Sequence, residues 1–205
     1  ERLNFRGEHY KLTLMSPFFN PGPIEHPHIP IYIAGVNTGL CRLAGEAADG
    51  FHSHPYHSAR YLREVVRPAI AEGAGRAGRS LAEVSLSTTA FAVTSPEEAE
   101  FVRSQIAFYA STPSYRPVME LHGWGDTADQ LQGLARRGEW AGMGALITEE
   151  MLETFAVICK PKALGTALRE RYQGLVDRLA LYLPFLPGQR DEAWSELVQN
   201  IKGAA

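Results

Sequence analysis

Short apolar runs alternate with amphipathic stretches from residue 31 onwards, and this alternation predicts strands separated by helices. Runs rich in β-branched and aromatic residues predict strands at 31–34, 51–53, 84–93 and 179–183. Apolar positions three and four residues apart predict helices at 39–49, 56–73, 96–110, 114–122, 126–138, 149–157, 160–172 and 189–201. Alternating strands and helices indicate an α/β fold in which crossover helices connect a parallel sheet.

Two helix starts carry strong local signals. Ser95 suits the N-cap position, Pro96 the first helical position, and Glu97 and Glu98 the first turn. Thr148 precedes two further acidic residues in the same way. We expect helices to begin immediately after both caps.

Residues 1–30 differ from the rest of the chain because proline and turn-forming residues interrupt every apolar run. This segment is expected to be an irregular, extended connector. No repeat of fixed period and no low-complexity segment divides residues 1–205 further, so we expect one domain.

Composition narrows the class of protein. Hydrophobic residues make up 45% of the 205 residues and charged residues 21%, as in an ordinary globular chain. The net charge of −3 gives no basic excess for a nucleic-acid partner, and no apolar run reaches the length of a membrane span. Two distant cysteines form no disulfide framework, which favours a reducing, cytoplasmic setting.

The loop after the first predicted strand is the first candidate site, because ligands of parallel α/β proteins gather at the carboxyl ends of strands. It contains Gly35, Val36, Asn37 and Thr38, followed by Gly39. Glycine allows close backbone approach, and a helix starting here offers free N–H groups to a phosphate. A tight turn in which Asn37 or Thr38 caps the helix explains the same residues without a ligand.

A second candidate is the histidine-rich stretch 52–57, where His52 and His54 alternate at the end of a predicted strand. Imidazoles at this spacing suit either zinc or a contact with cofactor or substrate. The same spacing recurs at His26 and His28, but no nearby carboxylate or thiol completes a ligand set. We therefore predict no metal, and a contact of this loop with cofactor or substrate, or a solvent-facing role.

Other features carry less chemistry. The end of the last strand, 179–183, provides either a pocket wall or packing for the closing helix. Cys41 lies on an apolar helix face, which is typical of a small core residue. No nucleophile elbow, Cys-x-x-Cys or HExxH motif occurs in the sequence.

Several stretches together resemble the luciferase-like monooxygenase superfamily, and most closely its branch that depends on the deazaflavin coenzyme F-420. They are FRGEHY at 5–10, HIPIYIAG at 28–35, LAGEAADGF at 43–51, AGRAGR at 74–79, and the Lys-Pro pair at 160–161 that opens a helix. The resemblance implies a (β/α) TIM barrel. It also matches the loop from Gly35 to Thr38 to the cofactor's phosphate-bearing tail, and Ser53 and His54 to the next strand end facing the cofactor.

The resemblance covers only the C-terminal part of that family. A complete barrel needs about 250 residues, and the family's first βα units are not found in these 205. We expect the C-terminal half of a barrel, either part of a longer chain or a shortened member. The family's catalytic histidine and carboxylate belong to the missing units, so no catalytic residue is assigned.

The activity that the resemblance implies is hydride transfer between reduced coenzyme F-420 and a small organic substrate. An FMN-dependent monooxygenase is one alternative, and a non-catalytic truncated barrel that binds a partner is another. Analogy with the family favours a homodimer.

Overall fold

A parallel sheet forms the centre of the computed structural model, which describes residues 3–183, 188 and 191–202. Its strands are β3 (Tyr32–Gly35), β4 (Gly50–Ser53), β5 (Ser85–Val93), β6 (Ala156–Ile158) and β7 (Arg178–Leu181). Every pairing between them is parallel. The predicted α/β class with a parallel sheet is confirmed.

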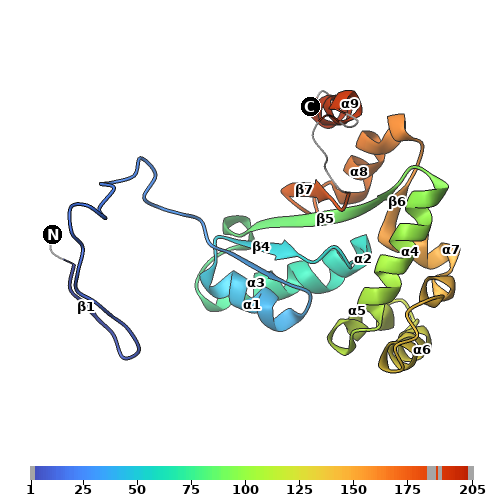
Figure 1. Ribbon diagram of the computed structural model, residues 1–205, viewed down its shortest axis with the longest axis horizontal. Helices are drawn as coiled ribbons and strands as arrows, with labels where there is room; N and C mark the ends of the chain where they lie inside the picture. Colours follow the sequence, from blue (N-terminus) through green and yellow to red (C-terminus); the bar gives the residue numbers. More distant parts are fainter. Residues whose placement is uncertain (1–2, 184–187, 189–190, 203–205) are drawn as a thin grey trace. The chain divides into compact units, whose positions relative to one another are not determined.

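The long strand β5 organises the sheet, with β3 and β4 on one side and β7 on the other (Figure 1). Successive peptide groups of a strand face opposite edges. The carbonyl of Ala90 accepts a hydrogen bond from Tyr182 after β7, whereas that of Val93 accepts one from Cys159 after β6. Short β6 therefore extends the β4 side, at the carboxyl end of β5. The main wall of the sheet has the order β3-β4-β5-β7.

Helices connect the strands and cover one face of the sheet. They are α1 (Thr38–Ala47), α2 (Ala59–Tyr61), α3 (Arg67–Arg76), α4 (Pro96–Ala110), α5 (Arg116–Glu120), α6 (Gly125–Arg136), α7 (Glu149–Phe155), α8 (Leu164–Tyr172) and α9 (Asp191–Lys202). Helix α4 has the predicted bounds, because Ser95 accepts a hydrogen bond from the backbone of Glu98. Thr148 caps α7 in the same way. The predicted start at 189 lies outside the described residues.

Most of the other predicted helices and strands differ from the structure by a few residues at one or both ends, and two helices need comment. The helix expected at 56–73 begins only after Ser58, whose side chain caps α2. It then passes through one π-helical turn, Leu62–Val66, into α3. The helix expected at 149–157 ends at Phe155, because the next residues pair with β5 as strand β6.

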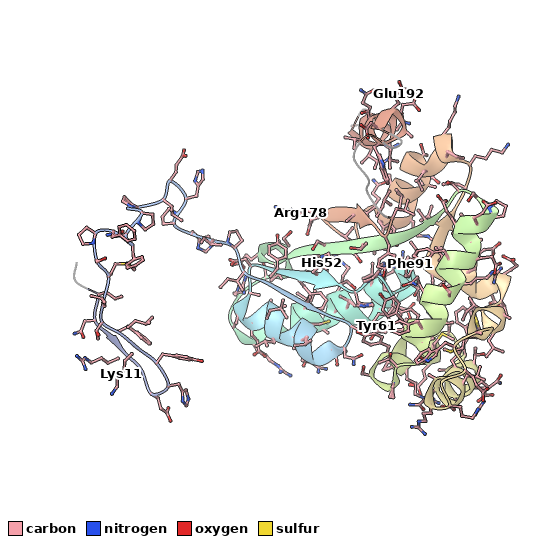
Figure 2. All side chains as sticks on the ribbon, viewed as in Figure 1. Lys11, His52, Tyr61, Phe91, Arg178 and Glu192 are labelled. Atoms are coloured by element: carbon pink, nitrogen blue, oxygen red, sulfur yellow. The ribbon has the colours of Figure 1, made fainter. Side chains whose placement is uncertain are left out.

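The two faces of the sheet have different character. On the helix-covered face, Phe51, Leu86 and Ala90 are fully or almost fully buried in the apolar core. On the opposite face His52 hydrogen-bonds Ser87, and Figure 2 marks His52 and Arg178 along the sheet. One side of the wall is therefore an apolar core and the other a partly polar, open surface.

A close helix crossing fixes α1 against α3. A Cβ atom added to Gly73 would lie 2.0 Å from the carbonyl oxygen of Arg42, and one added to Gly45 would lie 2.2 Å from that of Ile70. Only glycine permits the two backbones to approach this closely. The position of α1 is therefore set by backbone contact.

Residues Glu1–Pro30 form a separate compact unit from Ile31–Ala205. Within it, β1 (Phe5–Arg6) and β2 (Lys11–Leu12) pair antiparallel. The N–H of Gly7 donates to the carbonyl of Tyr10 at 2.9 Å and closes the turn. The rest of the unit's described residues contain no strand or helix.

Candidate functional site

The loop between β3 and α1 leaves the first turn of α1 without a side-chain cap. Asn37 occupies the N-cap position, but its side chain accepts no hydrogen bond from the helix. Its Nδ2 instead donates to the carbonyl of Ser114 at 2.7 Å. No acidic residue lies in the first turn of α1. The alternative in which Asn37 caps the helix is therefore wrong, and no carboxylate in the first turn neutralises the positive end of the helix dipole.

Side chains around this loop hold it in place. The hydroxyl of Tyr61 donates to the carbonyl of Val36 at 3.3 Å, and the N–H of His54 donates to that of Gly35 at 3.1 Å. A Cβ on Gly35 would lie 2.7 Å from a methyl carbon of Leu40, so this position requires glycine. The loop is anchored through the carbonyl groups of Gly35 and Val36. These contacts leave the N–H groups at the start of α1 free.

Two polar atoms near the start of α1 bear on anion binding. Thr38 Oγ1 accepts a hydrogen bond from the guanidinium of Arg42 at 3.3 Å. Oδ1 of Asn37 is buried and has no hydrogen-bond partner among the described residues. The Arg42 guanidinium adds positive charge at the same helix end, although it also pairs with Glu72 at 2.7 Å.

The next strand end places Ser53 and His54 beside this loop. Ser53 is buried, and its carbonyl accepts a hydrogen bond from the hydroxyl of Thr88 at 3.2 Å. The N–H of Tyr56 donates to Nδ1 of His54 at 3.1 Å, so the neutral ring carries its proton on Nε2. The structure thus brings the predicted residues after β3 and β4 together through the hydrogen bond from His54 to Gly35.

Aromatic rings surround His54 on two sides. Its ring lies edge-to-face with Tyr109 at 4.6 Å and tilted against Tyr115 at 5.0 Å. Burial, followed by the nearby His52, lowers the pKa of His54. His54 is therefore a neutral hydrogen-bond donor at physiological pH rather than an acid that carries charge.

The tyrosines continue this aromatic wall. Tyr182 donates to Gln105 Oε1 at 3.2 Å, so in the 3.0 Å pair of hydroxyls Tyr109 donates to Tyr182. Burial and the bond to Tyr182 raise the pKa of Tyr109 to about 12. The hydroxyl of Tyr56 is buried without a hydrogen-bond partner among the described residues. The wall therefore contains neutral hydroxyl groups.

A buried network behind the loop was not predicted from the sequence. Nδ1 of His57 donates to the carbonyl of His54 at 2.8 Å, and its Nε2 accepts from the hydroxyl of Tyr172 at 3.2 Å. Complete burial lowers the pKa of His57 to about 4. Tyr172 is 115 residues away in sequence, so no local pattern indicated this contact. His57 fixes the loop from behind.

The remaining candidate residues, His52 and Cys41, lie outside this loop. His52 lies on the open face of the sheet, 2.8 Å from Ser87 Oγ. Cys41 is fully buried in the core, as expected, and burial raises the pKa of its thiol to about 12. Within residues 3–183, 188 and 191–202, no group of three or more His, Cys, Asp or Glu side chains is arranged to hold a metal ion.

A cavity of about 430 Å³ lies near the ends of β5 and β7. It is lined by Leu183 together with Trp194 and Leu197 of α9, and by Thr94 and Glu98. The chain end after β7 thus contributes both a pocket wall and packing for α9. Residues 184 and 185, which follow this strand end, lie outside the described residues.

A parallel α/β sheet with helices on one face is the architecture of a barrel wall. A family model described as luciferase-like monooxygenase matches residues 1–178. The chain belongs to this family, and its sheet is part of a barrel.

Relatives of known sequence or structure extend beyond this chain. An uncharacterized protein of Mycobacterium tuberculosis is 40% identical over 207 residues, which cover 98% of this chain and 60% of that protein. A 5,10-methylenetetrahydromethanopterin reductase of Methanopyrus kandleri is 27% identical, over 82% of this chain and 48% of the enzyme. The chain therefore spans about half to three fifths of the length of these relatives.

Several solved structures share the fold. Among them is the coenzyme F-420-dependent tetrahydromethanopterin reductase from Methanopyrus kandleri, with a TM-score of 0.66 and 22% identity. The match covers 86% of this chain and 51% of the enzyme. The relatives whose names state an activity are oxidoreductases.

Among the described helices, none combines the length and the apolar character that crossing a bilayer requires.

Proposed function

We propose that this chain forms the tail-binding half of an oxidoreductase that transfers a hydride between reduced coenzyme F-420 and a small organic substrate. The observation that carries this proposal is the uncapped start of α1, anchored at the carboxyl end of β3. Membership of the luciferase-like family and the sequence relationship to a reductase support it.

The residues present fit an anionic cofactor tail. The first N–H groups of a helix have no acceptor within the helix, and here no side chain of Asn37 occupies them. A Cβ on Gly39 would meet nothing within 4 Å, so the space in front of the helix is open. A phosphate placed there would meet N–H donors, the helix dipole and the charge of Arg42.

Each part of the site has a distinct task in this reaction. The bound deazaflavin supplies the hydride chemistry. Thr38 and Gly39 bind the anionic tail through their backbone N–H groups, and Tyr61 positions the loop through Val36. His54 presents its Nε2–H as a neutral donor at the strand end. Tyr109 and Tyr115 exclude water from the side of His54.

FMN is the alternative cofactor, because it also has a phosphate and the family's description is that of a monooxygenase. Both cofactors would place a phosphate in the same anion site, and this site therefore does not discriminate between F-420 and FMN. Titration of the protein with F-420 and with FMN, followed by cofactor fluorescence, separates the two proposals. Tighter binding of FMN would replace hydride transfer by FMN-dependent monooxygenation.

The anion site itself is tested by Gly39→Glu, with Gly39→Gln as the matched control. The added carboxylate has open space, and at a helix N-terminus it favours folding. It nevertheless repels the cofactor phosphate, so we expect affinity to fall about tenfold relative to Gly39→Gln. Equal affinities for the two variants would remove the tail-binding role.

A chain that binds neither cofactor would support the non-catalytic alternative, a truncated barrel that binds a partner. We also propose a cytoplasmic location, supported by two cysteines, Cys41 and Cys159, that are both free thiols.

A further inference from the structure

The main chain of His54 is held on both sides. Its N–H donates to the carbonyl of Gly35 at 3.1 Å, which ties it to the loop after β3. Its carbonyl accepts from Nδ1 of His57 at 2.8 Å, and His57 is buried and bonded in turn to Tyr172 of α8. Each polar group of the His54 main chain therefore has a fixed partner.

The imidazole ring of His54 is held as well. Nδ1 accepts a hydrogen bond from the N–H of Tyr56 at 3.1 Å, and the ring packs against Tyr109 and Tyr115. A half-turn of the ring would lose the bond from Tyr56. The structure therefore selects one ring orientation and one neutral tautomer, in which Nε2 carries the proton.

Nε2 is the one polar atom of His54 that has no partner among the described residues. The hydrogen bond of its side chain is made through Nδ1. In the part of the chain that the structure describes, Oδ1 of Asn37 and the hydroxyl of Tyr56 are the buried side-chain atoms without a partner. Nε2 is not among these enclosed atoms, so it is open. A donor that is oriented before binding loses little entropy when its acceptor arrives.

The neighbours of the His54 ring indicate which kind of acceptor suits this donor. Burial lowers the pKa of His54, and burial and the bond to Tyr182 raise the pKa of Tyr109 to about 12, so both groups are uncharged. A phosphate is bound most strongly by charged donors. Aromatic neighbours and a neutral N–H instead favour a flat ring that has a carbonyl group.

The cofactors of the proposed function contain such a ring at a limited distance from a phosphate. In both F-420 and FMN, a polyol chain joins the phosphate to a ring system with carbonyl groups. Gly35 is bonded directly to His54, and α1 begins three residues later at Thr38, at most about 11 Å away. The start of α1 and His54 therefore lie within the span of one such molecule.

We propose that His54 donates its Nε2–H to a ring carbonyl of the cofactor and so orients the ring relative to the tail at the start of α1. The proposal rests on the proposed function and adds a second contact to it. His57 and Tyr172 are positioning residues in this arrangement, because they act through the main chain of His54. Hydrogen bonds to the ring are one of the ways in which a protein tunes a bound redox cofactor.

The first test compares His54→Met with His54→Gln. Both variants lose the imidazole and the bond from Tyr56, and only glutamine keeps an N–H donor at about the reach of Nε2. In fluorescence titrations with F-420, we expect His54→Met to bind about tenfold more weakly than His54→Gln. Equal affinities would overturn this proposal alone. An unchanged chain that binds no F-420 would overturn the proposed function together with it.

The second test separates the ring from the phosphate. Its probe is the hydroxy-deazariboflavin that remains when the phosphate tail of F-420 is removed. We expect the ratio between His54→Met and His54→Gln to be the same for this molecule as for F-420. The ratio between Gly39→Glu and Gly39→Gln should exceed one for F-420 only. A His54 effect confined to F-420 would assign the contact to the tail and contradict the proposal.

The third test separates the ring from the polyol chain. The absorption band of a chromophore shifts when its carbonyl group loses a hydrogen bond, and the polyol hydroxyls are not part of the chromophore. We expect bound F-420 to absorb at different wavelengths in His54→Met and His54→Gln. Identical bands combined with weaker binding to His54→Met would assign the contact to the polyol chain, against the proposal.

A fourth measurement needs no substitution and decides the matter if the variants fail to fold. In the unchanged protein with isotope-labelled histidine, the Nε2 resonance of His54 is identified by nuclear magnetic resonance through its main-chain correlations. We expect it to move when F-420 is added and to stay in place when inorganic phosphate alone is added. A resonance that F-420 leaves unmoved, or that phosphate alone moves equally, would show that the ring is not its acceptor.

Discussion

Two strand-to-helix junctions at the same end of the sheet differ in how they treat the free N–H groups at the start of the following helix. After β5, Ser95 accepts from the backbone of Glu98, and the carboxylate of Glu98 accepts from both N–H and hydroxyl of Thr94. After β3, the side chain of Asn37 turns away from α1 and binds Ser114. One junction satisfies its own N–H groups, and the other leaves them available.

This difference separates a structural helix start from a binding one. The start of α4 carries two acidic residues that neutralise the helix dipole, whereas α1 has none in its first turn. An uncapped helix start costs folding stability. The proposed function gives a reason for this cost, because an uncapped helix start at the carboxyl end of a strand can bind a ligand.

The largest expected effect on the unfolding free energy comes from a substitution that displaces the whole of α1. In Gly73→Ala the new methyl group would lie 2.0 Å from the carbonyl oxygen of Arg42, so the two helices must separate. We expect a loss of about 3 kcal/mol or more in unfolding free energy from overpacking, measured by urea denaturation. Gly75→Ala is the matched control on α3, because its Cβ meets nothing within 4 Å. Equal losses would show that the close crossing does not position α1.

The next largest expected effect is on the pH dependence of the unfolding free energy, and it arises at the junction after β4. The pKa of His57 is about 4 in the folded chain, against 6.5 for an ordinary histidine. The unfolded chain therefore binds the proton more tightly, and stability is lost as pH falls from 6.5 to 4. The loss reaches at most about 3 kcal/mol, from 1.36 kcal/mol per pKa unit. Urea denaturation between pH 4 and 8 should show a shallower pH dependence for His57→Gln than for the unchanged chain.

The two junctions should respond differently to removal of their N-cap side chains. Ser95→Ala removes a cap and should cost about 1 kcal/mol. Asn37→Ala removes no cap, so its cost should come from the lost bond to Ser114. Urea denaturation of both variants measures the two costs. If Asn37→Ala costs nothing, the bond from Asn37 to the carbonyl of Ser114 does not contribute to the stability of the chain.

The smallest expected effect is a gain in thermal stability. Gly39→Glu should unfold at a higher temperature than Gly39→Gln, because a carboxylate at a helix N-terminus stabilises by about 0.3–1 kcal/mol. Calorimetry at low and high salt checks this, since screening should reduce the difference. No gain would mean that the helix start is already neutralised, contrary to the comparison of α1 with α4.

Local signals predicted the elements that local interactions determine. The bounds of α4 follow from Ser95 and its neighbours, and the residues fixing them lie within four positions of one another. Strand β6 was missed because its three residues continue a helical pattern. Only their pairing with Phe91, Ala92 and Val93, more than 60 residues earlier, makes them a strand.

The candidate site was predicted in the same partial way. Gly35, the last residue of β3, and His54, directly after β4, lie at the strand ends where the sequence placed them, because both strands were predicted from local patterns. The role of Asn37 depends on Ser114, and that of His57 on Tyr172. Both partners are distant in sequence, so only the folded chain reveals which polar groups are engaged and which remain available.

The π-helical turn Leu62–Val66 has a consequence for how this helix can change length. Tyr61 before the turn contacts Val36, and Gly73 after it contacts α1. A wide turn holds one more residue than an α-helical turn, so it absorbs one extra residue without rotating the two contacts relative to each other. Deleting a single residue here would restore a regular helix and leave both contacts on the faces that they now occupy. The helix can therefore change its length by one residue at this turn while the same element still holds the loop and the helix crossing.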